Sequence, residues 1–250
     1  MRALVTGASS GIGRDIAKEL ANRGYEVILV ARNEDKLKSI KEEIGDKASI
    51  YVADISDVQT CRKIHENVGA VDILVNNAGF GLFGRFNVTD LDKEISMINT
   101  NIVGLHALTK LFLKDMVEQD RGYILNVASI AGHMPGPLMD TYYATKAYVH
   151  RLSCGINEEL RRDKINVKVG TLNPGPVKTN FNKVAGVKFN LSSLTSNYVA
   201  KYTVDMMLKG KTDITPGAKI KMLRFIAKIV PAGTMSKFVY NTQKNRDKER

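Results

Sequence analysis

A glycine-rich turn close to the start of the chain constrains its fold more than any other feature. Residues 3–5, ALV, form a short apolar run, and residues 6–13, TGASSGIG, follow at once with three glycines. Ile12, Ile16 and Leu20 then recur at a spacing of four, as on one face of a helix. In a strand–turn–helix unit of this kind, glycines let the backbone approach a pyrophosphate, which lies at the positive end of the helix.

The spacing of this turn is G-x-x-x-G-x-G, which is weak as a bare pattern because any strand-to-helix turn can use glycine. Its place after the first expected strand and before a helix favours a dinucleotide-binding site. The candidate cofactor contacts in the turn are Gly7, Ser9, Ser10, Gly11, Ile12 and Gly13.

Short β-rich runs recur along the chain, with helix-like segments between several of them. The runs after the first lie at residues 27–30, 49–53, 72–75, 123–127 and 167–172. Most are apolar throughout, which is typical of parallel strands covered by helices on both faces. The alternation predicts an α/β, doubly wound, Rossmann-type fold with a mostly parallel sheet. No linker or repeat interrupts the pattern, so we expect one domain over residues 1–250.

The net charge of +11 invites a nucleic-acid interpretation, but the distribution of the charge argues against it. Residues 1–210 hold 27 basic and 23 acidic side chains, whereas residues 211–250 hold 10 and 3. The excess is mostly a basic tail, and we expect no nucleic-acid partner.

The cysteines and the N-terminal residues favour a cytoplasmic protein. Cys61 and Cys154 lie far apart and lack metal-ligand spacing, so we expect reduced thiols and no metal. Nothing at the start is typical of a secretory signal. No apolar stretch approaches the roughly 18 residues that span a bilayer.

The end of the second expected strand indicates which dinucleotide binds. NAD-preferring sites usually place an acidic residue there for the ribose 2′-hydroxyl. Here Ala31 is followed by Arg32, whose guanidinium can bind a 2′-phosphate that a carboxylate would repel. The alternative is that Arg32 is a solvated loop residue and that Glu34 or Asp35 caps the next helix. Charge complementarity favours NADP(H).

Six motifs occur in a fixed order along the chain. They are TGASSGIG, NNAG at 76–79, NIVG at 101–104, Ser129, YYATK at 142–146 and NPGPVKT at 173–179. With these motifs the chain resembles the short-chain dehydrogenase/reductase family, in its compact single-domain branch. The resemblance runs from Ala3 to about Thr179, and the six motifs together are far more specific than any one. It implies an enzyme that interconverts carbonyl and alcohol groups, assembled as a dimer or tetramer.

Two adjacent tyrosines compete for the role of catalytic acid. Tyr142 and Tyr143 lie four and three residues before Lys146, and on a helix both spacings bring a phenol beside the ammonium. Geometry alone therefore leaves both open. The family pattern is Tyr-x-x-x-Lys with a serine thirteen residues before the tyrosine, and both rules select Tyr142. Tyr143 is then interpreted as a packed aromatic on the same helix.

The resemblance also assigns chemistry to the neighbouring residues. Reduction of a carbonyl needs hydride at carbon and a proton at oxygen, and a phenol with its ordinary pKa of about 10 is a poor acid–base group near pH 7. We expect the ammonium of Lys146 to lower the pKa of Tyr142 and to bind the nicotinamide ribose. Ser129 is expected to hydrogen-bond the substrate carbonyl. Asn101 resembles the family asparagine that holds a relay water, although Asn99 lies two residues away.

The remaining motifs are expected to bind the cofactor. After the third expected strand, Asp54 and Ile55 match adenine contacts, and the alternative for Asp54 is a helix cap. Residues 77–79 match the stretch beneath the adenine ribose, and the loop at 173–179 matches contacts to the carboxamide and diphosphate. The candidate residues in these two segments are Asn77, Ala78, Gly79, Pro174, Gly175, Val177 and Thr179.

Substrate identity lies in segments that the family leaves free, including residues 80–86, 133–140 and a substrate loop at about 178–197. They carry Phe80, Phe83, Phe86, Met134, Leu138, Met139 and Phe189 and few charges, which indicates an apolar substrate body. His133 is interpreted as a loop polar group. We expect an NADPH-dependent reductase of a ketone or aldehyde. The alternatives are an NADPH-binding sensor or scaffold, and a membrane-surface protein acting through its basic tail.

The tail, at about 217–250, is expected to begin with a basic amphipathic helix that ends before Pro231. Lys221, Arg224 and Lys228 form a narrow basic stripe, and apolar residues cover the rest. So wide an apolar face is expected to be covered. We rank packing on the protein or its dimer mate above contact with an anionic membrane, because a short helix with three cations anchors weakly. The last seven residues, KNRDKER, are expected to be disordered.

Overall fold

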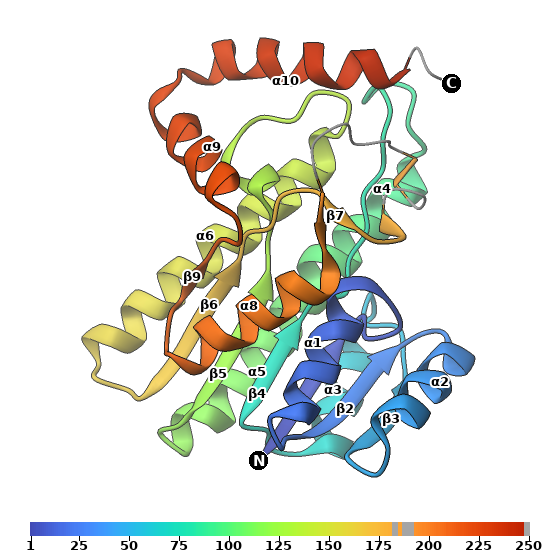
Figure 1. The fold of residues 1–250 in the computed structure, drawn as a ribbon, viewed down its shortest axis with the longest axis vertical. Helices are drawn as coiled ribbons and strands as arrows, with labels where there is room; N and C mark the ends of the chain where they lie inside the picture. The colour runs from blue at the N-terminus through green and yellow to red at the C-terminus, as the bar shows by residue number, and fades with distance from the viewer. Residues whose placement is uncertain (182–184, 187–192, 248–250) are drawn as a thin grey trace.

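Seven parallel strands form the central sheet of the structure, a computed structural model that describes residues 1–181, 185–186 and 193–247 (Figure 1). In spatial order the strands are β3 (Ala48–Val52), β2 (Glu26–Ala31), β1 (Arg2–Thr6), β4 (Ile73–Asn76), β5 (Gly122–Val127), β6 (Val167–Leu172) and β9 (Asp213–Ile214). The order runs outward in opposite directions from β1 and β4, so the topological switch point lies between these two strands. A crevice at such a switch point is where doubly wound folds bind their ligands.

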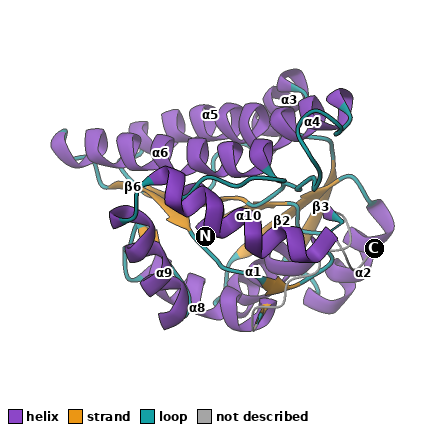
Figure 2. Ribbon diagram, turned by 90° about the horizontal axis from the view of Figure 1, so that it is seen from above, coloured by secondary structure: helices purple, strands orange, loops and turns teal. Residues whose placement is uncertain are grey.

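Helices cover both faces of the sheet, as the view from above shows (Figure 2). One face packs against α1 (Gly11–Asn22), α2 (Glu34–Ile44) and α8 (Ser196–Leu208). The other packs against α3 (Val58–Val68), α5 (Leu105–Glu118) and α6 (Asp140–Arg162). The doubly wound single domain expected from the sequence is therefore confirmed.

Strand β1 illustrates why the strands are apolar throughout. Ala3 and Val5 point into the core beneath α1, α2 and α8, whereas Leu4 points into the core beneath α3, α5 and α6. All three side chains are fully buried. Because alternate residues of a strand face opposite sides of a sheet, a strand covered on both sides has no polar face to present.

Shorter elements complete the described chain around the carboxyl ends of the strands. They are α4 (Leu91–Ile98), the π-helix η1 (Asn99–Gly104), the 3-10 helix η2 (Ile130–His133) and the paired strands β7 (Val177–Lys178) and β8 (Leu194–Thr195). Residues 182–184 and 187–192 of the substrate loop predicted at 178–197 lie outside the described residues, and Phe189 is among them.

The C-terminal extension contains two helices, α9 (Ala218–Ile229) and α10 (Ala232–Asp247), whereas the sequence predicted the first helix and disorder over the last seven residues. Pro231 lies between them, as expected of a residue that cannot continue a helix but suits the start of the next. Because α10 continues to Asp247, the prediction of disorder is wrong for residues 244–247. Figure 1 shows α10 in red lying across the end of the molecule above α6. No described helix is both long and apolar enough to cross a bilayer.

Candidate active site

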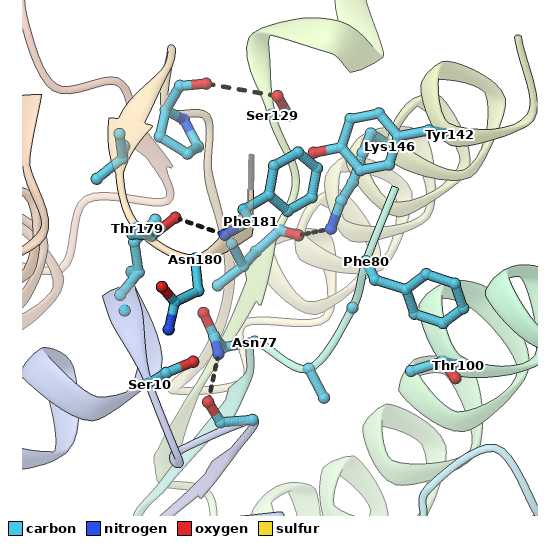
Figure 3. Close-up of a pocket in the computed structure, with 18 of the residues that line it drawn as sticks. Ser10, Asn77, Phe80, Thr100, Ser129, Tyr142, Lys146, Thr179, Asn180 and Phe181 are labelled. Atoms are coloured by element: carbon cyan, nitrogen blue, oxygen red, sulfur yellow. Dashed lines mark hydrogen bonds between the residues drawn. The ribbon is translucent and has the colours of Figure 1, made fainter. Parts of the chain in front are cut away.

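A cavity of about 450 Å³ opens at the carboxyl ends of the strands and gathers nearly all the predicted site residues (Figure 3). The predicted residues that line it are Gly7, Ser9, Ser10, Gly11, Ile12, Arg32, Asp54, Ile55, Asn77, Ala78, Gly79, Ser129, Tyr142, Lys146, Pro174, Gly175, Val177 and Thr179. Two predicted residues, Gly13 and Asn101, lie behind the lining. Segments far apart in the sequence thus meet at one site.

The turn after β1 has the shape that a diphosphate site needs. Gly7 adopts φ +64°, in the left-handed region, and a Cβ there would lie 2.7 Å from the Cα of Ala78. Helix α1 begins at Gly11 with no side-chain cap and no acidic residue in its first turn. The backbone N–H groups at its start therefore face the cavity side without a competing carboxylate, which suits an anion.

Gly13 has a packing role that explains its absence from the cavity lining. A Cβ on Gly13 would lie 2.3 Å from Nδ2 of Asn77. That amide donates hydrogen bonds to the carbonyl oxygens of Thr6, at 3.1 Å, and Gly7, at 3.2 Å. Gly13 thus leaves the space in which Asn77 holds the turn in shape.

Two cations border the end of the cavity next to β2 and β3, of which sequence analysis identified one. Arg32 is exposed, and its Nη1 lies 3.5 Å from Oδ2 of Asp54. Lys36, which was not predicted, lies on the first turn of α2 and also lines the cavity. The sequence did contain a signal for Lys36, because it lies four residues after Arg32 on the helix that follows the second strand.

The alternatives that Glu34 or Asp35 caps α2, and that Asp54 caps α3, are wrong. Asn33 caps α2 by accepting a hydrogen bond from the backbone N–H of Lys36, and Asp57 caps α3. Burial raises the pKa of Asp54, but hydrogen bonds from Ser56 and the charge of Arg32 bring that pKa below its usual value. Asp54 is therefore an ionised group at the cavity wall.

Tyr142 and Ser129 meet at the other end of the cavity. Ser129 precedes η2 and accepts a hydrogen bond from the backbone N–H of Ala131 at 3.2 Å. Burial raises the pKa of Tyr142 above its usual value, and its hydrogen bond with Ser129 lowers that pKa part of the way back. Burial therefore sets the direction of the shift, opposite to the lowering that the sequence predicted, and Tyr142 is a neutral phenol.

Lys146 lies one helical turn after Tyr142 on α6, and both side chains point into the same part of the cavity (Figure 3). Its Nζ donates a hydrogen bond to the carbonyl oxygen of Val127 at 2.7 Å and lies 5.8 Å from the centre of the Tyr142 ring. Burial lowers the pKa of Lys146 to about 8. The ammonium is thus held by the end of β5, and it loses its proton near pH 8.

Asn101 lies in the π-helix η1, a distortion that often marks a functional site. Its Nδ2 donates to the carbonyl oxygen of Phe80 at 2.9 Å and to Oγ1 of Thr145 at 3.1 Å. Its Oδ1 accepts a hydrogen bond from the Phe80 N–H at 3.1 Å. The carboxamide therefore joins the loop after β4 to helix α6, and it does not line the cavity. These contacts give no support for a relay through this side chain.

Tyr143 is more than a packed aromatic. It lines the cavity, and its ring lies so close to Gly136 that a Cβ there would be 2.0 Å from the ring. Its hydroxyl accepts a hydrogen bond from Nε2 of Gln243, on α10, at 3.2 Å. No local pattern predicts this contact, because the two residues are 100 positions apart.

An apolar cluster lies beyond Tyr142 and contributes Met139 and Phe181 to the wall of the cavity. Its buried members are Phe83, Leu138, Met139 and Ala185, and Tyr142, Tyr143, Phe181 and Tyr240 pack against them. The two phenylalanines Phe83 and Phe86, both predicted to contact an apolar substrate, differ in burial. Phe83 is buried in this cluster, whereas Phe86 is 67% exposed. His133 lies outside the lining, with Nε2 3.0 Å from Oδ1 of Asn173, as a polar loop residue should. Asn180 and Phe181, at the start of the predicted substrate loop, also line the cavity, and so does Thr100, which sequence analysis missed.

The chain is similar in sequence to known oxidoreductases. The family model described as short chain dehydrogenase matches residues 1–188. An uncharacterised oxidoreductase of Staphylococcus epidermidis is 36% identical over 181 residues, which are 71% of this chain and 78% of the relative. The very-long-chain 3-oxoacyl-CoA reductase of Anas platyrhynchos is 33% identical over 257 residues, covering 97% of this chain and 80% of the relative.

Solved structures resemble the chain as well. A short-chain dehydrogenase from Sphingobium yanoikuyae in complex with NADPH superposes with a TM-score of 0.83 at 26% identity, covering 91% of this chain and 92% of that one. An alcohol dehydrogenase from Thermococcus sibiricus complexed with 5-hydroxy-NADP gives a TM-score of 0.74 at 28% identity, covering 86% and 94%. A relative from Burkholderia phymatum in complex with NAD, at 23% identity, shares the fold with a TM-score of 0.81.

Proposed function

Because the chain belongs to the short-chain dehydrogenase family and is an oxidoreductase of that family, we propose that it uses NADPH to reduce a ketone or aldehyde on a largely apolar small molecule to the alcohol. The observation that carries the proposal is the convergence of Tyr142, Ser129 and Lys146 beside an apolar wall, at the end of the cavity away from Arg32. A carbonyl placed between these polar groups would have its apolar body against that wall.

The residues at the opposite end of the cavity fit a dinucleotide with a 2′-phosphate. The start of α1 offers backbone N–H groups to the diphosphate, and Asn77 holds the turn that presents them. Arg32 and Lys36 offer two cations where the adenosine ribose would lie. The nicotinamide ring supplies hydride when bound. The NADPH complex of the Sphingobium relative supports this choice.

Tyr142 is proposed as the acid that completes reduction. The O–H bond of its phenol breaks as the proton passes to the carbonyl oxygen, while hydride bonds to the carbonyl carbon, so the product is a neutral alcohol. Ser129 would donate a hydrogen bond to the same oxygen and hold it close to the phenol. The raised pKa of Tyr142 keeps its proton in place at neutral pH, which favours the direction of reduction.

Lys146 is proposed to hold positive charge beside the phenol as the proton leaves. A buried ammonium favours the phenolate that forms, because opposite charges attract strongly where water is excluded. Its hydrogen bond to Val127 fixes where that charge lies. Asn101 is proposed as a positioning residue that holds the loop after β4 against α6.

NADPH oxidation across a panel of 3-oxoacyl thioesters, apolar ketones, aldehydes and sugars tests the proposal. We expect turnover with ketones that carry apolar bodies and none with sugars, because the wall beyond Tyr142 is apolar. Tight NADPH binding without turnover on any carbonyl would favour the sensor or scaffold. We also propose a homo-oligomer, which analytical ultracentrifugation tests.

A further inference from the structure

One side of helix α9 is fixed against the body of the protein. Ile220 packs so closely on Gly175 that a Cβ there would lie 2.3 Å from its side chain. Arg224, only 9% exposed, forms an ion pair with Asp213 and donates a hydrogen bond to Oγ1 of Thr215 at 2.9 Å. These contacts determine which side of the helix faces outward. They also remove Arg224 from the surface stripe that the sequence predicted.

The outer side of α9 carries an apolar stripe, which we define as Met222, Phe225, Ile226 and Ile229. Their spacing of i, i+3, i+4 and i+7 places them in one row along the helix. Each is between 40% and 65% exposed. A contiguous apolar row on a surface is typical of a site that contacts another hydrophobic phase.

Lysines border the stripe on both edges. Lys219 lies three residues before Met222, while Lys221 lies four before Phe225 and Lys228 three after it, so each is a neighbour on the helix surface. All three are exposed. Residues 218–246 contain no aspartate or glutamate. This segment therefore carries positive charges and no negative one.

We propose that the apolar stripe of α9 docks on the surface of an anionic lipid bilayer, with the lysines at the headgroups. An apolar row edged by cations on a helix lying flat is the arrangement that binds such an interface. A second copy of the chain fits less well, because pairing two such surfaces brings lysine edges together with no carboxylate between them. The stripe spans only one short helix, so the binding is reversible.

Docking through α9 would place the substrate end of the cavity near the bilayer. Ile220 of α9 touches Gly175, which lines the cavity, and Gln243 of α10 contacts Tyr143 at the apolar wall. A substrate with an apolar body could then pass between lipid and enzyme. This consequence rests on the proposed function, whereas docking itself does not.

Co-sedimentation of the full-length protein with vesicles, without substrate, tests the docking. We expect the wild type to bind vesicles containing phosphatidylglycerol and to remain in the supernatant with phosphatidylcholine alone. Removing two apolar side chains, in Phe225→Ser with Ile229→Ser, should weaken binding about tenfold or more. Reversing two charges, in Lys219→Glu with Lys228→Glu, should weaken it about twentyfold or more, since each lysine near an anionic surface contributes about fivefold.

Matched controls change the same chemistry on α8 and at Lys209, the residue that follows it. Leu208→Ser removes an exposed apolar side chain there, and Lys201→Glu with Lys209→Glu makes the same change in net charge. Both should bind vesicles like the wild type, and all variants should keep wild-type NADPH affinity. Three results would overturn the proposal. The wild type does not bind anionic vesicles, it binds both kinds of vesicle equally, or the α8 controls weaken binding as much as the α9 variants do. If the wild type does not bind vesicles and the Phe225→Ser, Ile229→Ser variant dissociates into monomers, the stripe instead contacts a second copy of the chain.

Discussion

The side-chain amide of Gln243 donates a hydrogen bond to the hydroxyl of Tyr143, joining the C-terminal helix α10 to the wall of the candidate active site over 3.2 Å. Gln243 is 1% exposed, and Met235 and Val239 on the same helix are also buried. Tyr240 packs against the cluster that includes Tyr143. Helix α10 thus borders the candidate active site and holds the Tyr143 ring, next to Tyr142, in place.

Replacing Gln243 with leucine should therefore weaken substrate binding more than it slows chemistry. We expect KM for an apolar ketone to rise about twofold to tenfold, the range for one neutral hydrogen bond, with kcat nearly unchanged. Asn241→Leu changes an exposed residue of the same helix and should leave KM and kcat unchanged. A kcat that falls as far as kcat/KM would show that the contact acts in the chemical step.

The two tyrosines should differ sharply in steady-state kinetics. Tyr142→Phe removes the proposed transferable proton and should reduce kcat by at least about a hundredfold, with NADPH affinity almost unchanged. Tyr143→Phe keeps the ring against Gly136 and loses only the hydroxyl that Gln243 contacts, so most of kcat should remain. The reverse result would mean that Tyr143 is the acid.

The fold could be predicted from the sequence because its signals are local and repeated. Each strand is a short apolar run, and the residues that line the cavity follow directly where a strand ends, as Arg32 follows β2 and Asp54 follows β3. Parallel strands bring such positions to one edge of the sheet. The predicted roles of these residues stay predictions, since geometry shows proximity and kinetics must show chemistry.

What could not be predicted depends on contacts between distant side chains. The approach of Gln243 to Tyr143 has no periodic pattern, and neither does the pairing of Arg224 with Asp213 that buries one member of the expected basic stripe. The sequence predicted a lowered pKa for Tyr142, whereas burial raises it. The spacing of the two residues correctly predicted that Lys146 lies near the Tyr142 ring. The sequence does not show how deeply the phenol is buried, and burial is the largest cause of the shift in its pKa.

Cofactor preference should depend on the two cations at the end of the cavity. Arg32→Ala should raise KM for NADPH about tenfold to a hundredfold, the range for a charge-assisted contact with a phosphate, and leave KM for NADH nearly unchanged. Lys36→Ala should act in the same direction. Lys38→Ala, an exposed lysine on the same helix that pairs with Glu34, is the matched control. Equal affinity of the wild type for NADPH and NADH would contradict the assignment.

The pKa of Lys146 predicts how activity depends on pH. Burial lowers that pKa from its usual range to about 8, so Lys146 carries an ammonium below about pH 8 and a neutral amine above it. Only the ammonium can stabilise the phenolate that Tyr142 becomes as it gives up its proton. The value of kcat/KM for NADPH, which reports groups in the free enzyme, should therefore be level below pH 8 and fall as pH rises through it.

This profile separates Lys146 from other groups whose titration could lower activity at high pH. The pKa of Tyr142 is raised by burial, so loss of its proton would produce a fall at a clearly higher pH. Removing salt should leave the midpoint nearly unchanged, because a buried ammonium is poorly screened. A rate that stays level up to pH 10 would show that Lys146 keeps its proton, and that its hydrogen bond to Val127 outweighs the effect of burial.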